Sequence, residues 1–138
     1  MTFEQIRIAV ESRLAEWPTH GPLPSAPVAF DSVPIGPSVK AAQDAKEPWV
    51  RCVIQHGDSR TAGIGSQPCV RRTGLIMCQV FTAERIGSAT AAQLADSLAE
   101  HLQYWQSGQF STQAASVRRV GPQDGWFQYN VTTPFRAG

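Results

Sequence analysis

The sequence has little cysteine, histidine and lysine, and it lacks a long apolar run. Its three cysteines never occur as C-x-x-C, and its three histidines never occur as H-x-x-x-H. Tetrahedral zinc sites use such spacings, so a structural metal is not expected. No apolar stretch approaches the roughly 18 residues that cross a membrane as a helix. The sequence therefore predicts no structural metal and no membrane partner.

The cysteine content and the N-terminal segment also bear on where the chain is made. Cys52, Cys69 and Cys78 are odd in number, which argues against a framework of disulfides. The first residues, MTFEQIRIAVESRL, include acidic side chains and lack the apolar core of a secretion signal. We expect synthesis in the cytosol and three free thiols. All three cysteines lie in or next to predicted strands, which predicts that they are buried as small apolar residues.

Motifs for catalysis are missing as well. The glycine-rich stretch GDSRTAGIGS lacks the G-x-x-x-x-G-K-[ST] pattern, and a strand follows it where a phosphate loop would need a helix. Glu4 and Glu11 are predicted two turns apart on one helix, and Asp96 and Glu100 one turn apart on another. Both pairs are typical of solvated helix faces. The sequence therefore nominates no catalytic residue, and an enzyme stays an open alternative at this point.

Charge is present, and it is unevenly distributed along the chain. Residues 48–82 carry four arginines and one aspartate, and residues 110–138 carry three arginines and one aspartate. The predicted helical regions, residues 1–47 and 83–109, each have a net charge of −2. Arginine outnumbers lysine ten to two, and its rigid guanidinium suits contacts between macromolecules. These arginines are either solvated strand-edge charges or interface residues. The candidate interface residues are Arg60, Arg71, Arg72, Arg118 and Arg119.

Hydrophobic periodicity predicts two main helices. A capping box of Thr2 and Gln5 precedes apolar residues at helical spacing, which predicts a helix over residues 3–16. A second helix is expected to begin at Ser88 or at a capping box of Thr90 and Gln93, and to stop at Gly108. The proline-rich stretch PTHGPLPSAP is predicted to be a loop, as is most of residues 31–48.

The strands alternate less regularly with these helices than a parallel fold would require. Strands are predicted over residues 28–30, 49–56, 70–82, 116–120 and 126–135, in the order α-β-β-β-α-β-β. We therefore expect a single α+β domain over residues 1–138, with a mostly antiparallel sheet flanked by the two main helices. Residues 57–68 are predicted to form a long hairpin loop.

The run RRTGLIMCQVF, residues 71–81, is apolar at nearly every position. A strand with one face in water would show polar residues at every second position, whereas this run has only Gln79 between its apolar residues. We expect a central strand with both faces covered. Helices on both faces of a monomer would cover it, and so would one layer of helices and a neighbouring subunit.

The same residues argue against specific recognition of DNA. The pairs Arg71–Arg72 and Arg118–Arg119 are not interleaved with exposed aromatic residues, which single-strand binders use to stack bases. The net charge of +1 is close to neutral. At most, a weakly basic surface that tolerates passing double-stranded DNA is expected.

The order of these segments, together with the length, resembles the tail terminator proteins of long-tailed, non-contractile, lambda-like bacteriophages and their relatives in prophages and gene transfer agents. The segments that carry the resemblance span nearly the whole chain. They are FEQIRIAVESRLAEW, VAFDSVPIGP, WVRCVIQHGDSRTAGIG, RRTGLIMCQVFTAERIGSATAAQLADSLAEHL and GWFQYNVTTPFR.

The resemblance implies a structural virion protein, assembled in the host cytoplasm, with no enzymatic activity and no cofactor. Members form a hexameric ring at the head-proximal end of the tail tube, stop its polymerisation and provide the surface on which the head docks. The implied partners are other copies of the chain, the tail tube protein and a head-completion or connector protein. Two alternatives stay open: another neck component, such as a head-closure or tail-completion protein, and a small ligand-binding protein or enzyme with an unrecognised site.

Overall fold

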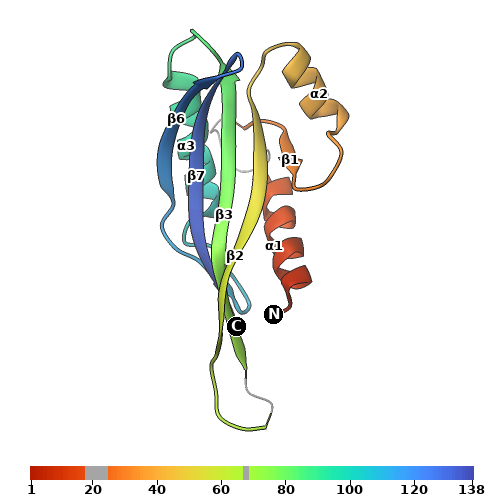
Figure 1. Cartoon of the computed structure of the whole chain (residues 1–138), viewed down its shortest axis with the longest axis vertical. Helices are drawn as coiled ribbons and strands as arrows, with labels where there is room; N and C mark the ends of the chain where they lie inside the picture. Colours follow the sequence, from red (N-terminus) through yellow and green to blue (C-terminus); the bar gives the residue numbers. More distant parts are fainter. Residues whose placement is uncertain (18–24, 67–68) are drawn as a thin grey trace.

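The computed structural model describes residues 1–17, 25–66 and 69–138, which form an α+β fold with a seven-stranded sheet (Figure 1). The strands are ordered β1-β2-β3-β7-β5-β4, and β6 also pairs with β7. β1 is parallel to β2, and the other pairs are antiparallel. The predicted fold class is thereby confirmed. The elements are α1 (Phe3–Ala15), β1 (Val28–Phe30), α2 (Pro37–Asp44), β2 (Trp49–Thr61), β3 (Val70–Ala83), α3 (Ala89–Leu102), β4 (Gln106–Ser107), β5 (Phe110–Thr112), β6 (Ser116–Gln123) and β7 (Trp126–Ala137).

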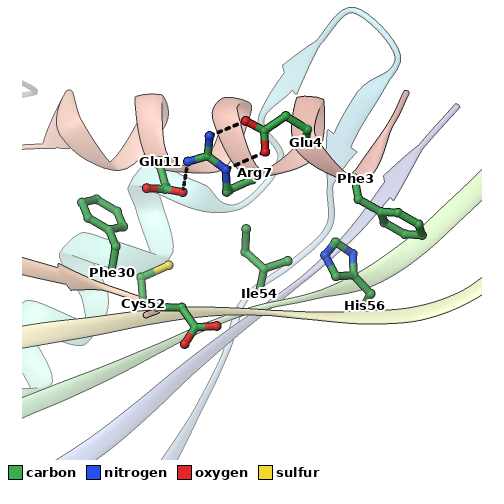
Figure 2. Close-up of a pocket in the computed structure, with 9 residues that line it drawn as sticks. Phe3, Glu4, Arg7, Glu11, Phe30, Cys52, Ile54 and His56 are labelled. Carbon is green, nitrogen blue, oxygen red and sulfur yellow. Dashed lines mark hydrogen bonds and ion pairs between the residues drawn. The ribbon is translucent and has the colours of Figure 1, made fainter. Parts of the chain in front are cut away.

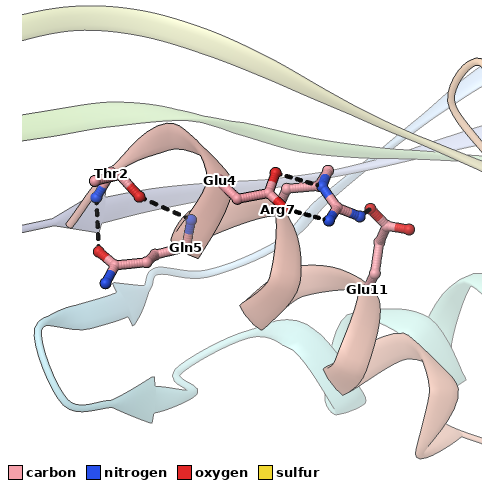
Figure 3. Close-up of polar contacts among 5 residues, drawn as sticks. All are labelled: Thr2, Glu4, Gln5, Arg7 and Glu11. Atoms are coloured by element: carbon pink, nitrogen blue, oxygen red, sulfur yellow. Dashed lines mark hydrogen bonds and ion pairs between the residues drawn. The ribbon is translucent and has the colours of Figure 1, made fainter.

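Helix α1 begins at the capping box that the sequence predicts. The Thr2 side chain accepts a hydrogen bond from the Gln5 amide, and the Gln5 side chain accepts one from the Thr2 amide (Figure 3). These two bonds satisfy backbone donors that the first turn of a helix leaves free. The buried residues of α1 then follow at helical spacing: Ile6, Val10 and Leu14.

Helices α1 and α3 pack on the same face of the sheet and enclose the main core. Their buried side chains form one cluster with the sheet residues Val50, Cys52, Ile76, Cys78, Val80, Val131 and Phe135. Burying each such aliphatic side chain contributes about 1.5–3 kcal/mol. Polar bonds also join the helices, because Arg13 donates to the His101 carbonyl at 2.9 Å and Trp17 donates to the Ser97 hydroxyl at 2.9 Å.

The prediction of a loop over residues 57–68 is wrong in its first part, because β2 continues to Thr61. A bulge between His56 and Ser59 shifts the register by one residue, after which Arg60 pairs with Arg71 and Thr61 with Val70. Residues 59–61 and 70–72 therefore continue the hairpin of β2 and β3, and we call this segment the tongue; Arg72 at its base also pairs with Ala137 of β7. The tongue extends beyond the body of the sheet (Figure 1).

Residues 37–44, which the sequence predicts to be loop, form helix α2. Pro37 lies in its first turn, where a missing amide hydrogen costs nothing. Val39 and Ala42 are buried against Ala29 and Trp49, and this contact stabilises a helix too short to be stable alone. Much of the predicted proline-rich loop, residues 18–24, lies outside the described residues.

Helix α3 begins at the first of the two predicted positions, with Ser88 as its N-cap, and ends earlier than predicted. It begins after Ser88, whose side chain makes no capping bond, so the capping box expected at Thr90 does not form the helix start. The helix ends at Leu102, before the predicted stop at Gly108. The intervening residues form the short hairpin of β4 and β5, and Gly108 has a positive φ of 59° in its turn.

The structure separates the three cysteines into two environments. Cys52 and Cys78 are buried and directly paired across β2 and β3, whereas Cys69 is exposed, which contradicts its predicted burial. The reason is that the tongue carries Cys69 away from the core. The hydrogen bond with Cys52, together with burial, raises the pKa of the Cys78 thiol.

Thiol reactivity should follow this division. Because the thiolate is the reactive form, Cys69 is expected to react rapidly with Ellman's reagent, and the other two thiols only after unfolding. The Cys69→Ser variant should lose the rapid phase and keep the slow one. Reaction of all three thiols at one rate in the folded protein would contradict the burial of Cys52 and Cys78.

Candidate subunit interface

The sheet face opposite α1 and α3 is largely uncovered, and we call it the open face. Its residues in β3 are Leu75, Met77, Gln79 and Phe81, which are only half-buried. The residues that alternate with them from Ile76 to Thr82 point to the helices and are fully buried. The prediction that both faces of this strand are covered is therefore wrong for the single chain. Helix α2 covers only the end near Phe81, where Trp49 stacks on the Phe81 ring at 4.4 Å between centroids.

The open face carries five arginines from four strands. Residues directly opposite each other in an antiparallel pair point to the same side of the sheet, so the strand register assigns each side chain to a face. In this register no acidic residue is paired at an open-face position of β2, β3, β6 or β7. The five arginines are all exposed: Arg51, Arg60, Arg71, Arg118 and Arg136.

Three of the five predicted interface residues thus lie on the open face, and two do not. Arg72 points to the opposite side, where its guanidinium lies 4.3 Å from the centre of the Phe3 ring. Arg119 lies over the Phe127 ring at 5.4 Å, also on the side of the helices. A cation over an aromatic face is an attractive contact within the chain. Arg72 and Arg119 therefore each contact an aromatic ring of their own chain, whereas Arg71, within the described part of the chain, donates only to the Gly138 main-chain oxygen, at 3.4 Å.

Sequence reasoning missed Arg51 and Arg136 as members of the open face. Arg51 is opposite Gln79, and Arg136 is opposite Thr73. Strand alternation from the apolar residues of β2 would have placed Arg51 opposite the core. Arg136 needed the register of β7 with β3, which the sequence does not contain.

Like charges meet directly in the tongue. Arg60 and Arg71 are opposite each other across β2 and β3, and neither forms an ion pair with an Asp or Glu side chain among residues 1–17, 25–66 and 69–138; Arg71 donates to the Gly138 main-chain oxygen at 3.4 Å. Like charges at directly opposed positions destabilise a strand pair. A carboxylate or another anion bound between the two guanidinium groups would remove this repulsion, so the tongue is suited to an acidic partner.

The centre of the open face is a band of uncharged residues that would suit a protein partner. Val53 is opposite Met77, and Leu75 is opposite Pro134, all four half-buried. Interfaces between proteins commonly combine such an apolar centre with a charged rim, and arginine is enriched there. The open face has this arrangement, with arginines at both ends of the band.

A groove of about 330 Å³ between α1 and β2 was considered as a ligand or enzyme site (Figure 2). Cys52 and His56 both line it, but four strand residues separate them, which is about 13 Å. No hydrogen bond joins them in the described part of the chain. A nucleophile needs a base within hydrogen-bonding reach, so this pair does not form a catalytic site.

The charged groups of the same groove bind one another. Arg7 donates to Glu4 at 2.8 Å and to Glu11 at 2.8 Å, so one guanidinium spans both carboxylates (Figure 3). The hydrogen bond from Arg7 lowers the pKa of Glu4. The ring of Phe3 meets the ring of His56 edge-on at 4.8 Å and closes one end. The groove is therefore best described as part of the contact between α1 and the sheet.

No helix in the described part of the chain is long and apolar enough to cross a membrane. The comparisons with known proteins concern the fold and the family. The alignment with one solved structure covers 100% of this chain and 96% of the other chain. Its TM-score is 0.70 and the sequence identity is 19%, which shows a shared fold. No curated protein sequence matches the chain.

A family model described as phage tail terminator protein matches residues 5–135. The match covers all the helices and strands apart from the first two residues of α1 and the last two of β7, and it includes the tongue and the open face except Arg136. The resemblance that the sequence segments suggest is thereby confirmed. The chain belongs to the phage tail terminator protein family, whose members are structural components of the phage tail.

Proposed function

We propose that this protein forms a hexameric ring on the head-proximal end of the tail tube, ends the polymerisation of the tube and provides the surface on which the head docks. The observation that carries the proposal is the family match over residues 5–135. Its partners are then other copies of the chain, the tail tube protein and a head-completion protein. It acts in the neck of the virion through its surfaces, without a reaction or a cofactor.

Two features of the fold support this function. A ring of identical subunits needs two different complementary surfaces on each chain, because its interfaces join head to tail. The open face is basic and partly apolar, and the outer surface of α3 on the other side carries the exposed carboxylates of Asp96 and Glu100. The tongue extends far enough from the sheet to contact a neighbouring molecule (Figure 1).

Loss of the protein should change tail length and head attachment. In lysates of a phage or prophage whose copy of this gene is disrupted, negative-stain images are expected to show overlong tails and tails without heads. The physical reason is that an uncapped tube end keeps adding subunits and offers no head-docking surface. Supplying the wild-type protein from a plasmid should restore uniform tails with heads. Normal tails attached to heads in the disrupted strain would refute the proposal.

A further inference from the structure

We propose that the open face is the subunit interface of the ring, and that the outer surface of α3 from the next copy covers it. The proposal rests on the ring described above. It assigns the two surfaces of each subunit that meet: the basic sheet face around Arg60 and Arg71, and the acidic helix surface around Asp96 and Glu100. It also selects a second copy of this chain over every other acidic partner.

The first step is to ask which acidic groups are available to the arginines. In α1, Arg7 already binds Glu4 and Glu11. In α2, Lys40 binds Asp44 at 3.1 Å. Within the described residues, Asp96 and Glu100 of α3 are exposed and form no ion pair. The same holds for Asp31, Glu47, Asp58, Glu84 and Asp124 as regards ion pairs, but only Asp96 and Glu100 lie one turn apart on a helix.

The second step is the spacing of the charges. Asp96 and Glu100 are one helical turn apart, so their Cβ atoms are separated by about 5–6 Å. Arg60 and Arg71 are directly opposed across two strands, with Cβ atoms about 4.5–5.5 Å apart. The spacing of the two arginines on the open face therefore matches the spacing of the two carboxylates on α3. Each arginine can face one carboxylate, which relieves both repulsions.

The third step is the shape of the helix surface. Around the two carboxylates, the outer side of α3 carries Ala92, Gln93 and Ala99, which are small or uncharged. A helix with such residues can lie close to the strand pair, while the apolar band of Val53 and Met77 lies six residues of β3 from Arg71, roughly 20 Å away, and is left to other residues of the neighbouring copy. Duplex DNA would have no use for that band, since phosphates bind charges and not aliphatic side chains.

The fourth step is symmetry. The open face and α3 lie on opposite sides of the sheet, because α3 packs with the core on the other face. Two copies related by a two-fold axis could not bring each open face onto the partner's α3 and remain a closed pair of identical contacts. Contact between opposite sides instead joins copies head to tail and gives a ring when the rotation closes.

The test is an exchange of charges between the two surfaces, measured by sedimentation velocity of the purified full chain over a range of concentrations. Arg60→Glu with Arg71→Glu, and separately Asp96→Arg with Glu100→Arg, should each weaken self-association by about tenfold or more. Mixing the two variants should restore association, because each altered surface then meets a complementary one in an alternating ring. Combining all four substitutions in one chain should restore it too.

Matched controls separate this interface from general charge and folding effects. Lys40→Glu with Arg85→Glu makes the same change in net charge as Arg60→Glu with Arg71→Glu, at exposed residues outside both charged pairs, and it should leave self-association unchanged. Circular dichroism melts should show that every variant folds as the wild type does.

Several results would overturn the proposal. The first is that either charge-reversed variant self-associates as strongly as the wild type. The second is that association does not recover in the mixture or in the chain with all four substitutions. The third is that the wild-type chain never self-associates. A face variant that assembles normally but loses retention of duplex DNA in a gel-shift assay would identify a nucleic-acid surface instead. Tail imaging separates the two proposals. If the charge exchange shows rings built by this interface but the disrupted strain has normal tails, the proposed function is refuted and the proposed interface is retained.

Discussion

Replacing Phe110 by alanine is expected to lower the free energy of unfolding by about 3–5 kcal/mol. The Phe110 side chain is completely buried in β5, with ring centroids 5.0 Å from Trp105 and 5.3 Å from Phe135. Its loss removes apolar burial and leaves a cavity that two large rings cannot fill without moving. Since β5 contains only three residues, the hairpin of β4 and β5 has few other contacts to hold it on β7.

The measurement is urea unfolding followed by circular dichroism, with a thermal melt that should fall by about 10–20 °C. Tyr104→Ala is the matched control, because it truncates an aromatic residue that is 74% exposed. It should change the free energy of unfolding by less than about 0.5 kcal/mol. A loss below about 1 kcal/mol for Phe110→Ala would show that neighbouring side chains refill the site, contrary to the close packing described here.

Replacing Gly74 by alanine should also destabilise the fold, by about 1–3 kcal/mol or more. A Cβ atom at this position would lie 2.5 Å from the Gln55 carbonyl oxygen and 2.6 Å from Cζ of Phe135. The Phe135 ring covers the glycine on the helical side of the sheet, and the carbonyl belongs to the neighbouring strand. Neither can move without disturbing the pairing of β3 with β2 and β7.

The control for this glycine is Gly36→Ala. Gly36 has a φ of −74°, and an added Cβ there meets no atom within 4 Å. Thermal melts of the two variants should therefore differ by several degrees, with Gly74→Ala the less stable. Equal stability would mean that the sheet can widen locally at Gly74, and that the aromatic cover of Phe135 is looser than the structure indicates.

The two stability variants also serve the functional tests. A variant that unfolds removes every surface at once, whereas the charge exchange on Arg60, Arg71, Asp96 and Glu100 leaves the core untouched. Comparing tail length in cells that carry each type of variant separates loss of protein from loss of an interface. Only the second kind of defect can be rescued by a complementary charge on another copy.

The difference between Arg71 and Arg72 shows how far the sequence reaches. Alternation along a strand predicts that the two side chains point to opposite faces. It does not tell which face the helices cover, because that depends on the packing of α1 and α3 against residues distant in the chain. The structure places Arg72 over Phe3 and leaves Arg71 on the open face, so two adjacent arginines have different roles.

Local signals determined the parts of this protein that local bonds stabilise. The capping box of Thr2 and Gln5, the apolar spacing of α1 and the alternation of β7 are properties of consecutive residues, and they predicted the main elements and the α+β class. The order of these segments along the chain carried the family resemblance.

The tertiary structure decided the rest, because the free energy that stabilises it comes from distant contacts. Helix α2 depends on Trp49, the hairpin of β4 and β5 depends on β7, and β2 continues past its bulge because β3 pairs with it. Strand register gathered five arginines on one face, although they are distributed from Arg51 to Arg136 in the sequence. The sequence alone predicted basic strands and acidic helices, and only the fold placed the five arginines of the open face on the side of the sheet opposite Asp96 and Glu100 of α3.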